Sequence, residues 1–80
     1  MAQRLTPDQR YSQLLQVAVE LANHNRTVMI THLDVANGAK VSVPTVRQYF
    51  KTKSILWAAI ARHPAAIEAV TDNARILRVS

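Results

Sequence analysis

The sequence has no cysteine, which excludes disulfide bonds and thiolate metal sites and is typical of a reducing compartment. It also lacks any apolar stretch close to the roughly 20 residues that a helix needs to span a bilayer. Residues 1–4 are not followed by an apolar run of signal-peptide length. We therefore expect a soluble, cytoplasmic protein that does not bind membranes.

Glycine is almost absent, with Gly38 its single occurrence, so we expect short loops and helices that follow one another closely. No Gly/Ser-rich linker, internal repeat or low-complexity tract divides the sequence, which predicts one domain over residues 1–80. Of the 80 residues 49% are hydrophobic, too many for a disordered tail. A domain this small buries only roughly 60–65% of its unfolded surface, and partner subunits often supply further burial.

Acidic residues are missing from the middle of the chain. Five Asp/Glu stand against ten Lys/Arg, which gives a net charge of +5, and no acid lies between Asp34 and Glu68. A basic segment without local acids attracts phosphates, although a solvated basic surface is the simpler alternative. This acid-free segment, residues 35–67, contains the cations Lys40, Arg47, Lys51, Lys53 and Arg62.

Residues that would carry out catalysis are missing as well. The chain has no glycine-rich phosphate loop and no acid–histidine pair at a useful spacing. His24, His32 and His63 are not spaced as metal ligands on one helix face, so we expect them at the surface or at helix caps. We predict no enzymatic activity, no cofactor and no metal.

The first half of the chain predicts two helices. Thr6 caps the first, with Pro7 at its first position and Gln9 completing a capping box. Residues 23–26 end this helix, and residues 27–30 form a short extended link. Thr31 caps the second helix, which ends around Gly38. The expected buried residues are Tyr11, Leu14, Leu15, Ala18, Leu21 and Ala22 in the first helix, and Leu33, Val35 and Ala36 in the second.

The second half predicts three more helices and an all-α fold. Ser42 caps the third helix, Thr52 ends it or caps the fourth, and residues 63–64 close the fourth. The fifth runs over about 64–78. The expected inward residues are Val46 and Phe50 in the third helix and Ile55, Leu56, Ala59 and Ile60 in the fourth. Ile67, Val70, Ala74 and Leu77 line one side of the last helix. Trp57 is expected in the core or at an interface. The last helix either covers the core or, as we expect, pairs with a second subunit.

Residues 34–53 form the most informative part of the chain, because they predict a short helix, a tight turn and a second short helix. Helices that cross closely through a turn need small or β-branched residues where they meet. Val35, Ala36, Val41 and Val46 meet that need. A second helix held in this way is presented on the surface, where it can enter the major groove of DNA.

At these positions the chain resembles the N-terminal DNA-binding domain of the TetR family of repressors. The similarity covers roughly residues 10–62 and implies a three-helix core with a helix-turn-helix. It is carried by Thr31, Val35-Ala36, Ala39-Lys40-Val41-Ser42, Thr45-Val46, Tyr49-Phe50, Thr52-Lys53 and Leu56, with Leu14, Leu15, Ala18 and Leu21 in the first helix.

Three departures from the family pattern have consequences. Lys40 stands where the family has its turn glycine, and a left-handed backbone there costs a non-glycine residue roughly 1 kcal/mol. Arg47 stands where a phosphate-binding tyrosine is usual, and arginine can make the same kind of contact with added charge. The family's large C-terminal ligand-binding domain has no counterpart, so we expect no small-molecule effector.

The residues that we expect to bind DNA belong to the second and third helices and the start of the fourth. Gln48 can pair with adenine, Arg47 with guanine or phosphate, and Val43 with a thymine methyl group. The full set is Thr31, Ser42, Val43, Pro44, Thr45, Arg47, Gln48, Tyr49, Lys51 and Lys53.

The remaining members of the set have backbone roles. The resemblance implies that Tyr49, Lys51 and Lys53 contact the DNA backbone, and Thr31 with the helix it caps can meet a phosphate. Each also has a structural alternative: Thr31 acts only as a cap, Tyr49 belongs to the core, and the two lysines are solvated charges.

Together these features predict a small homodimeric transcriptional repressor, associated with the nucleoid, that binds double-stranded DNA at an inverted-repeat operator. We expect the dimer to form through the C-terminal helix. A regulator this compact suits a plasmid or phage. The alternative is a helical adaptor whose basic face binds an acidic protein.

Overall fold

The structure is a computed structural model that describes residues 5–25 and 29–79, with side chains up to residue 72 and at Ala74. The described residues form the helices α1 (Pro7–His24), α2 (His32–Ala39), α3 (Val43–Tyr49), α4 (Lys53–Arg62) and α5 (Glu68–Val79). No strand occurs within these ranges, which confirms the predicted all-α fold. Residues 26–28, which include the first two residues of the predicted extended link, lie outside the described part.

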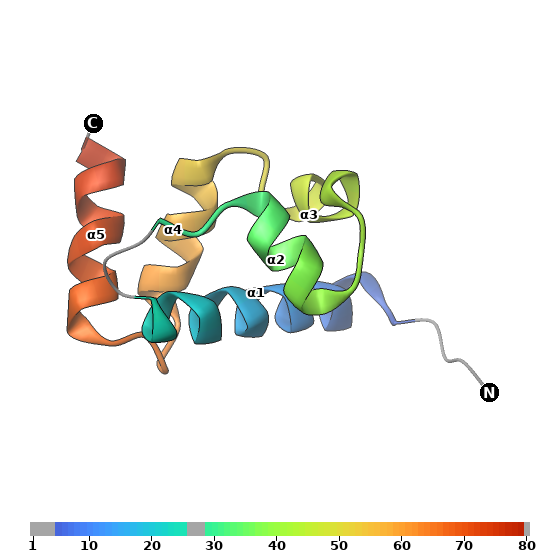
Figure 1. Cartoon of the computed structure of the whole chain (residues 1–80), viewed down its shortest axis with the longest axis horizontal. Coiled ribbons are helices and arrows are strands. Elements are labelled where there is room, and N and C mark those ends of the chain that lie inside the picture. The colour runs from blue at the N-terminus through green and yellow to red at the C-terminus, as the bar shows by residue number, and fades with distance from the viewer. Residues whose placement is uncertain (1–4, 26–28, 80) are drawn as a thin grey trace.

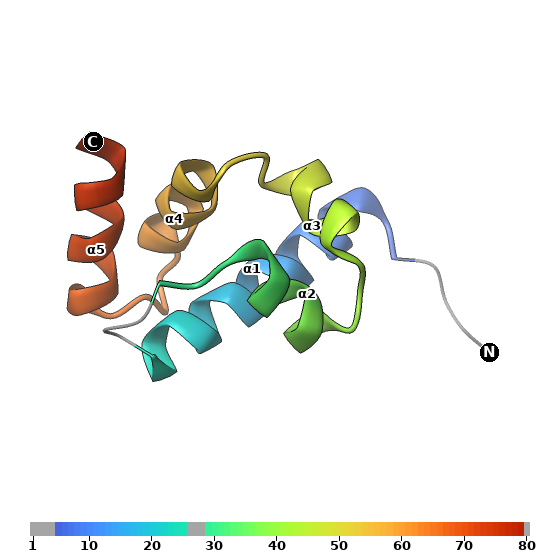
Figure 2. The same ribbon diagram turned by 45° about the horizontal axis from the view of Figure 1, so that its top comes forward.

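The long helix α1 runs beneath α2, α3 and α4, and α5 stands beyond its C-terminal end (Figure 1). The helix α2 packs on α1 and on α3, while α4 packs on α1 and on α5. A view turned by 45° shows the same order, with α2 and α3 towards one end and α5 at the other (Figure 2). The pair α2 and α3 is therefore well separated from the C-terminal helix.

Side-chain caps fix where four of the helices begin. The hydroxyl groups of Thr6, Thr31, Ser42 and Thr52 each accept a hydrogen bond from the backbone N–H three residues later. The first two belong to reciprocal capping boxes, of which the sequence analysis predicts the one at Thr6: Gln9 and Asp34 each accept the N–H of the capping threonine, at 2.9 and 3.0 Å. For Thr52, the prediction that it caps the fourth helix is confirmed.

One apolar core joins all five helices. Its largest fully buried side chains are Trp57 and Phe50, and Trp57 Nε1 donates a hydrogen bond to the carbonyl oxygen of Ile30 at 3.3 Å. The other buried apolar residues are Leu14, Ala18, Val19, Ala22, Ile30, Val35, Ala36, Val46, Leu56, Ile60, Val70 and Ala74. Trp57 is thus a core residue.

Three predicted core positions are wrong. Leu33 is 56% exposed, Ile55 is 46% exposed and Tyr11 is 39% exposed. In a helix of two or three turns, several neighbouring residues compete for one buried face, and spacing alone does not choose among them. The structure places His32 rather than Leu33 on the inner face of α2, and Trp57 rather than Ile55 on that of α4.

The predicted start of the last helix, at residue 64, is also wrong, because α5 begins at Glu68. The intervening loop is tied to α1: Asn23 Nδ2 donates to the Ala65 carbonyl at 2.8 Å, and Asn23 Oδ1 accepts the Ile67 N–H at 3.2 Å. Val70 and Ala74, two residues predicted for subunit pairing, are fully buried within the chain. The side chain of Leu77 lies outside the described residues.

Candidate nucleic-acid interface

The helices α2 and α3 form the predicted helix-turn-helix over a wedge of small side chains. Val35, Ala36 and Val46 are buried, and Val41 in the turn is half-buried. Gly38 extends this close packing to α1, because a Cβ atom at that position would lie only 2.7 Å from Val17 Cγ1. The wedge was predicted from the sequence, whereas the contact of Gly38 with α1 was not.

The turn between the two helices begins with a left-handed residue. Lys40 has φ 59° and ψ 42°, and within the described ranges no other non-glycine residue has a positive φ. Its N–H points back to the carbonyls of Ala36 and Asn37, and the Val41 N–H bonds the Ala36 carbonyl at 3.0 Å. This pattern closes the last turn of α2, so the turn keeps a geometry suited to glycine although lysine occupies it.

A buried histidine joins the start of α2 to the end of α3. His32 is 9% exposed, and its Nε2 lies 2.6 Å from the carbonyl oxygen of Phe50, to which it donates. Phe50 caps the C-terminus of α3, and its ring is fully buried. This bond was missed by sequence reasoning, which placed the histidines at the surface or at caps, because it links residues 18 positions apart.

The outer side of α3 carries the polar residues predicted to read bases. Arg47 and Gln48 are both exposed, as are Ser42 and Pro44 at the start of the helix. The Ser42 hydroxyl lies 2.9 Å from that of Thr45, which is half-buried. The helix therefore presents its polar groups to solvent while Val46 and Phe50 hold it against the core.

Two predicted contact residues also have structural roles. Val43 and Tyr49 are half-buried and pack against the core, so each offers only part of its surface. The Tyr49 ring centroid lies 6.4 Å from that of Tyr11, and the Tyr11 ring lies 5.1 Å from Phe50. These rings bring the beginning of α1 next to the end of α3.

The last three members of the predicted set flank α3. Lys51 and Lys53 are exposed, in the link to α4 and at its first residue. The half-buried Thr31 uses its hydroxyl as a cap for α2, accepting the Asp34 N–H at 3.2 Å. In the chain, seven of the ten predicted residues belong to α3 or its N-cap, Lys51 and Lys53 follow α3, and Thr31 caps α2.

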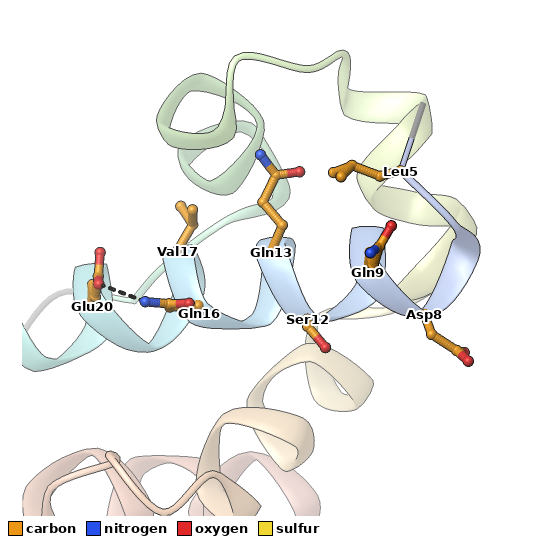
Figure 3. A pocket seen from close by; sticks show the side chains of 8 residues that line it. All are labelled: Leu5, Asp8, Gln9, Ser12, Gln13, Gln16, Val17 and Glu20. Atoms are coloured by element: carbon orange, nitrogen blue, oxygen red, sulfur yellow. Dashed lines mark hydrogen bonds between the residues drawn. The ribbon is translucent and has the colours of Figure 1, made fainter. Parts of the chain in front are cut away.

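A separate open hollow lies along α1 and has a volume of about 660 Å³. Figure 3 shows Gln13, Val17 and Leu5 beneath α2 and α3, with Asp8 and Glu20 at either end of the row. The hollow is lined by Leu5, Asp8, Gln9, Ser12, Gln13, Gln16, Val17 and Glu20. It contains none of the predicted DNA-binding residues, and its two charged groups are acids.

Two searches of the described residues found nothing further. No group of three or more His, Cys, Asp or Glu there could hold a metal ion. None of the described helices is both long and apolar enough to cross a membrane. In comparisons with known proteins, no family model, no curated protein and no solved structure matches this chain.

Proposed function

We propose that this protein is a sequence-specific DNA-binding repressor of transcription that acts as a small homodimer on an inverted-repeat operator. The observation that carries the proposal is the position of Arg47 and Gln48: both are exposed on α3, while Val46 on the same short helix is fully buried. The TetR-like pattern of the sequence supports the same function.

In this proposal α3 lies in the major groove, which is about 12 Å wide and admits a helix. Gln48 makes a bidentate contact with adenine, and Arg47 contacts guanine or a neighbouring phosphate. The exposed part of Val43 meets a thymine methyl group. These contacts supply the sequence preference.

The residues around α3 hold it in register. Lys51 and Lys53 neutralise phosphates, and the outer edge of Tyr49 adds a backbone contact. Since these three come from the end of α3, the link to α4 and the first residue of α4, they would fix both the depth and the direction of the helix in the groove. A dimer bound in this way at an operator blocks access of the polymerase.

The dimer contact belongs to α5 in this proposal. Because Val70 and Ala74 are already buried against the rest of the chain, the contact must use the sides of α5 that α4 leaves uncovered. A two-fold dimer would match the symmetry of an inverted repeat.

The proposal is tested by selecting DNA from a random-sequence duplex pool with the purified protein. We expect an inverted-repeat consensus whose half-site centres are about 10–10.5 base pairs apart, or a multiple of that spacing. The matched control is an Arg47→Ala/Gln48→Ala double variant, which should select no such consensus. If the parent protein also recovers none, the proposed function is wrong. Capture of an acidic protein that survives nuclease treatment would then favour the adaptor.

A further inference from the structure

The lysine in the turn of the helix-turn-helix occupies a backbone conformation that disfavours it. Lys40 has φ 59°, in the left-handed region that glycine adopts freely and other residues adopt at a cost. A strained residue that persists at such a place is a reason to look for a function. The side chain itself is exposed to solvent.

Its location brings the charge of Lys40 close to the start of α3. Lys40 precedes Ser42, the N-cap of α3, by two residues, so the two Cα atoms are at most about 7 Å apart. In helix-turn-helix proteins the first residues of the second helix contact base edges in the major groove. The phosphates that border the groove therefore lie within reach of the long side chain of Lys40, which is attached just before this helix.

We propose that Lys40 is a DNA-contacting residue, which neutralises a backbone phosphate beside the start of α3. The inference rests on the proposed function and adds to it a contact from the turn, which the sequence reasoning did not include among its DNA-binding residues. The charge lies in the acid-free segment, which is flanked in the sequence by Asp34 and Glu68. Asp34 is engaged in the capping box of α2, at the opposite end of that helix from Lys40.

A simpler reason for a lysine at this place is its attraction to the negative end of the α2 dipole. The two explanations predict different results for DNA binding by Lys40→Gly, since relief of the left-handed strain strengthens folding in either case. If the dipole is the reason, removal of the charge offsets part of that gain and leaves DNA binding unchanged. If the phosphate is the reason, DNA binding becomes weaker.

The experiment measures melting of the free protein and the salt dependence of binding to two duplexes, one carrying the selected consensus and one of unrelated sequence. We expect Lys40→Gly to melt about 4–8 °C higher than the parent. We also expect weaker binding to both duplexes, with a slope of log K against log salt that is shallower by about 1 for each bound subunit.

Three further variants serve as controls. Lys40→Asn removes the charge but tolerates the left-handed backbone, so it should bind DNA as weakly as Lys40→Gly. Lys40→Arg keeps the charge and should bind like the parent. Arg62→Gln removes one exposed charge at the last residue of α4 and should leave the slope unchanged.

Two results would overturn the inference alone: parent-like binding and slope in Lys40→Gly, or an equal loss of slope in Arg62→Gln. A parent protein that binds neither duplex would overturn both the inference and the proposed function. The two failures are therefore distinguishable.

Discussion

At the scale of single residues, Gly38 determines how closely α2 approaches α1. A Cβ added there would lie 2.7 Å from Val17 Cγ1 and 3.6 Å from Leu21 Cδ1, and the first distance is well inside ordinary van der Waals contact. Val17 is β-branched and has little freedom to move away. The sequence marks Gly38 only as the place where a helix ends, because the need for a missing side chain depends on a neighbour 21 positions earlier.

We therefore expect Gly38→Ala to destabilise the protein by about 1 kcal/mol in urea denaturation. Overpacking costs about 1–3 kcal/mol, and the higher helix propensity of alanine returns up to about 1 kcal/mol. The control is the same substitution in a Val17→Ala background, where the contact is gone and Gly38→Ala should become neutral or stabilising. An identical effect in both backgrounds would show that Val17 is not the cause.

At the scale of helices, α3 spans only seven residues, Val43–Tyr49, too few to be stable alone. Its position depends on the Ser42 cap at one end, on the buried side chains of Val46 and Phe50, and on the bond from His32 to the Phe50 carbonyl at the other end. A helix fixed at both ends can present its outer residues in one orientation.

In the proposed function, α3 contacts bases and the start of α4 contacts phosphates. Substitutions in the two helices should therefore have different effects. Gln48→Ala should remove about 1–3 kcal/mol of discrimination at one base pair of each half-site. Lys53→Ala, at the first residue of α4, should weaken binding to all sequences about equally and make the salt slope shallower by about 1 per subunit. Competition binding with single-base-pair variants of the consensus measures both effects. If both variants bind like the parent, the assignment of these residues is wrong.

The helix boundaries and the wedge were predictable because their signals are local. Capping residues lie three positions from their hydrogen-bond partners. The spacing of the small residues Val35, Ala36 and Val46 indicates where two helices cross closely. The errors involve distant partners. The burial of His32 depends on Phe50, and the late start of α5 depends on the bonds of Asn23 to the loop after α4. Neither interaction has a signature within one helix.

In the candidate site, the exposure of the polar residues could be predicted from the sequence, but the partial burial of its apolar and aromatic residues could not. The exposure of Arg47 and Gln48 follows from their place beside Val46 on a short helix, and the structure has both exposed. That Val43 and Tyr49 are half-buried required the structure, since their neighbours come from other helices. The left-handed backbone at Lys40 was anticipated only through a family pattern with glycine at that place. DNA binding itself stays a prediction.

At the scale of the whole molecule, charge is distributed unevenly. The hollow along α1 has acids, Asp8 and Glu20, whereas the chain from residue 35 to residue 67 has none. With a net charge of +5, the protein should attract DNA over distances longer than a contact. That attraction is screened by salt.

We expect this attraction to appear as a steep salt dependence. If a dimer neutralises about eight phosphates, log K against log salt should have a slope near −7. Fluorescence anisotropy with a labelled consensus duplex, measured between about 50 and 200 mM salt, gives the slope. A slope near zero would contradict binding through the cations around α3. A slope near −3.5 would indicate that one subunit binds alone.

The two ends of the molecule differ in what can be attached to them. The contact between Tyr11 and Tyr49 places the first turns of α1 beside α3, while α5 lies at the other end of the molecule (Figures 1 and 2). A fluorophore, an affinity tag or a sensor surface joined to the N-terminus would therefore crowd the proposed contact with DNA. Attached after α5 instead, the same label would lie away from α3 but beside the proposed dimer contact.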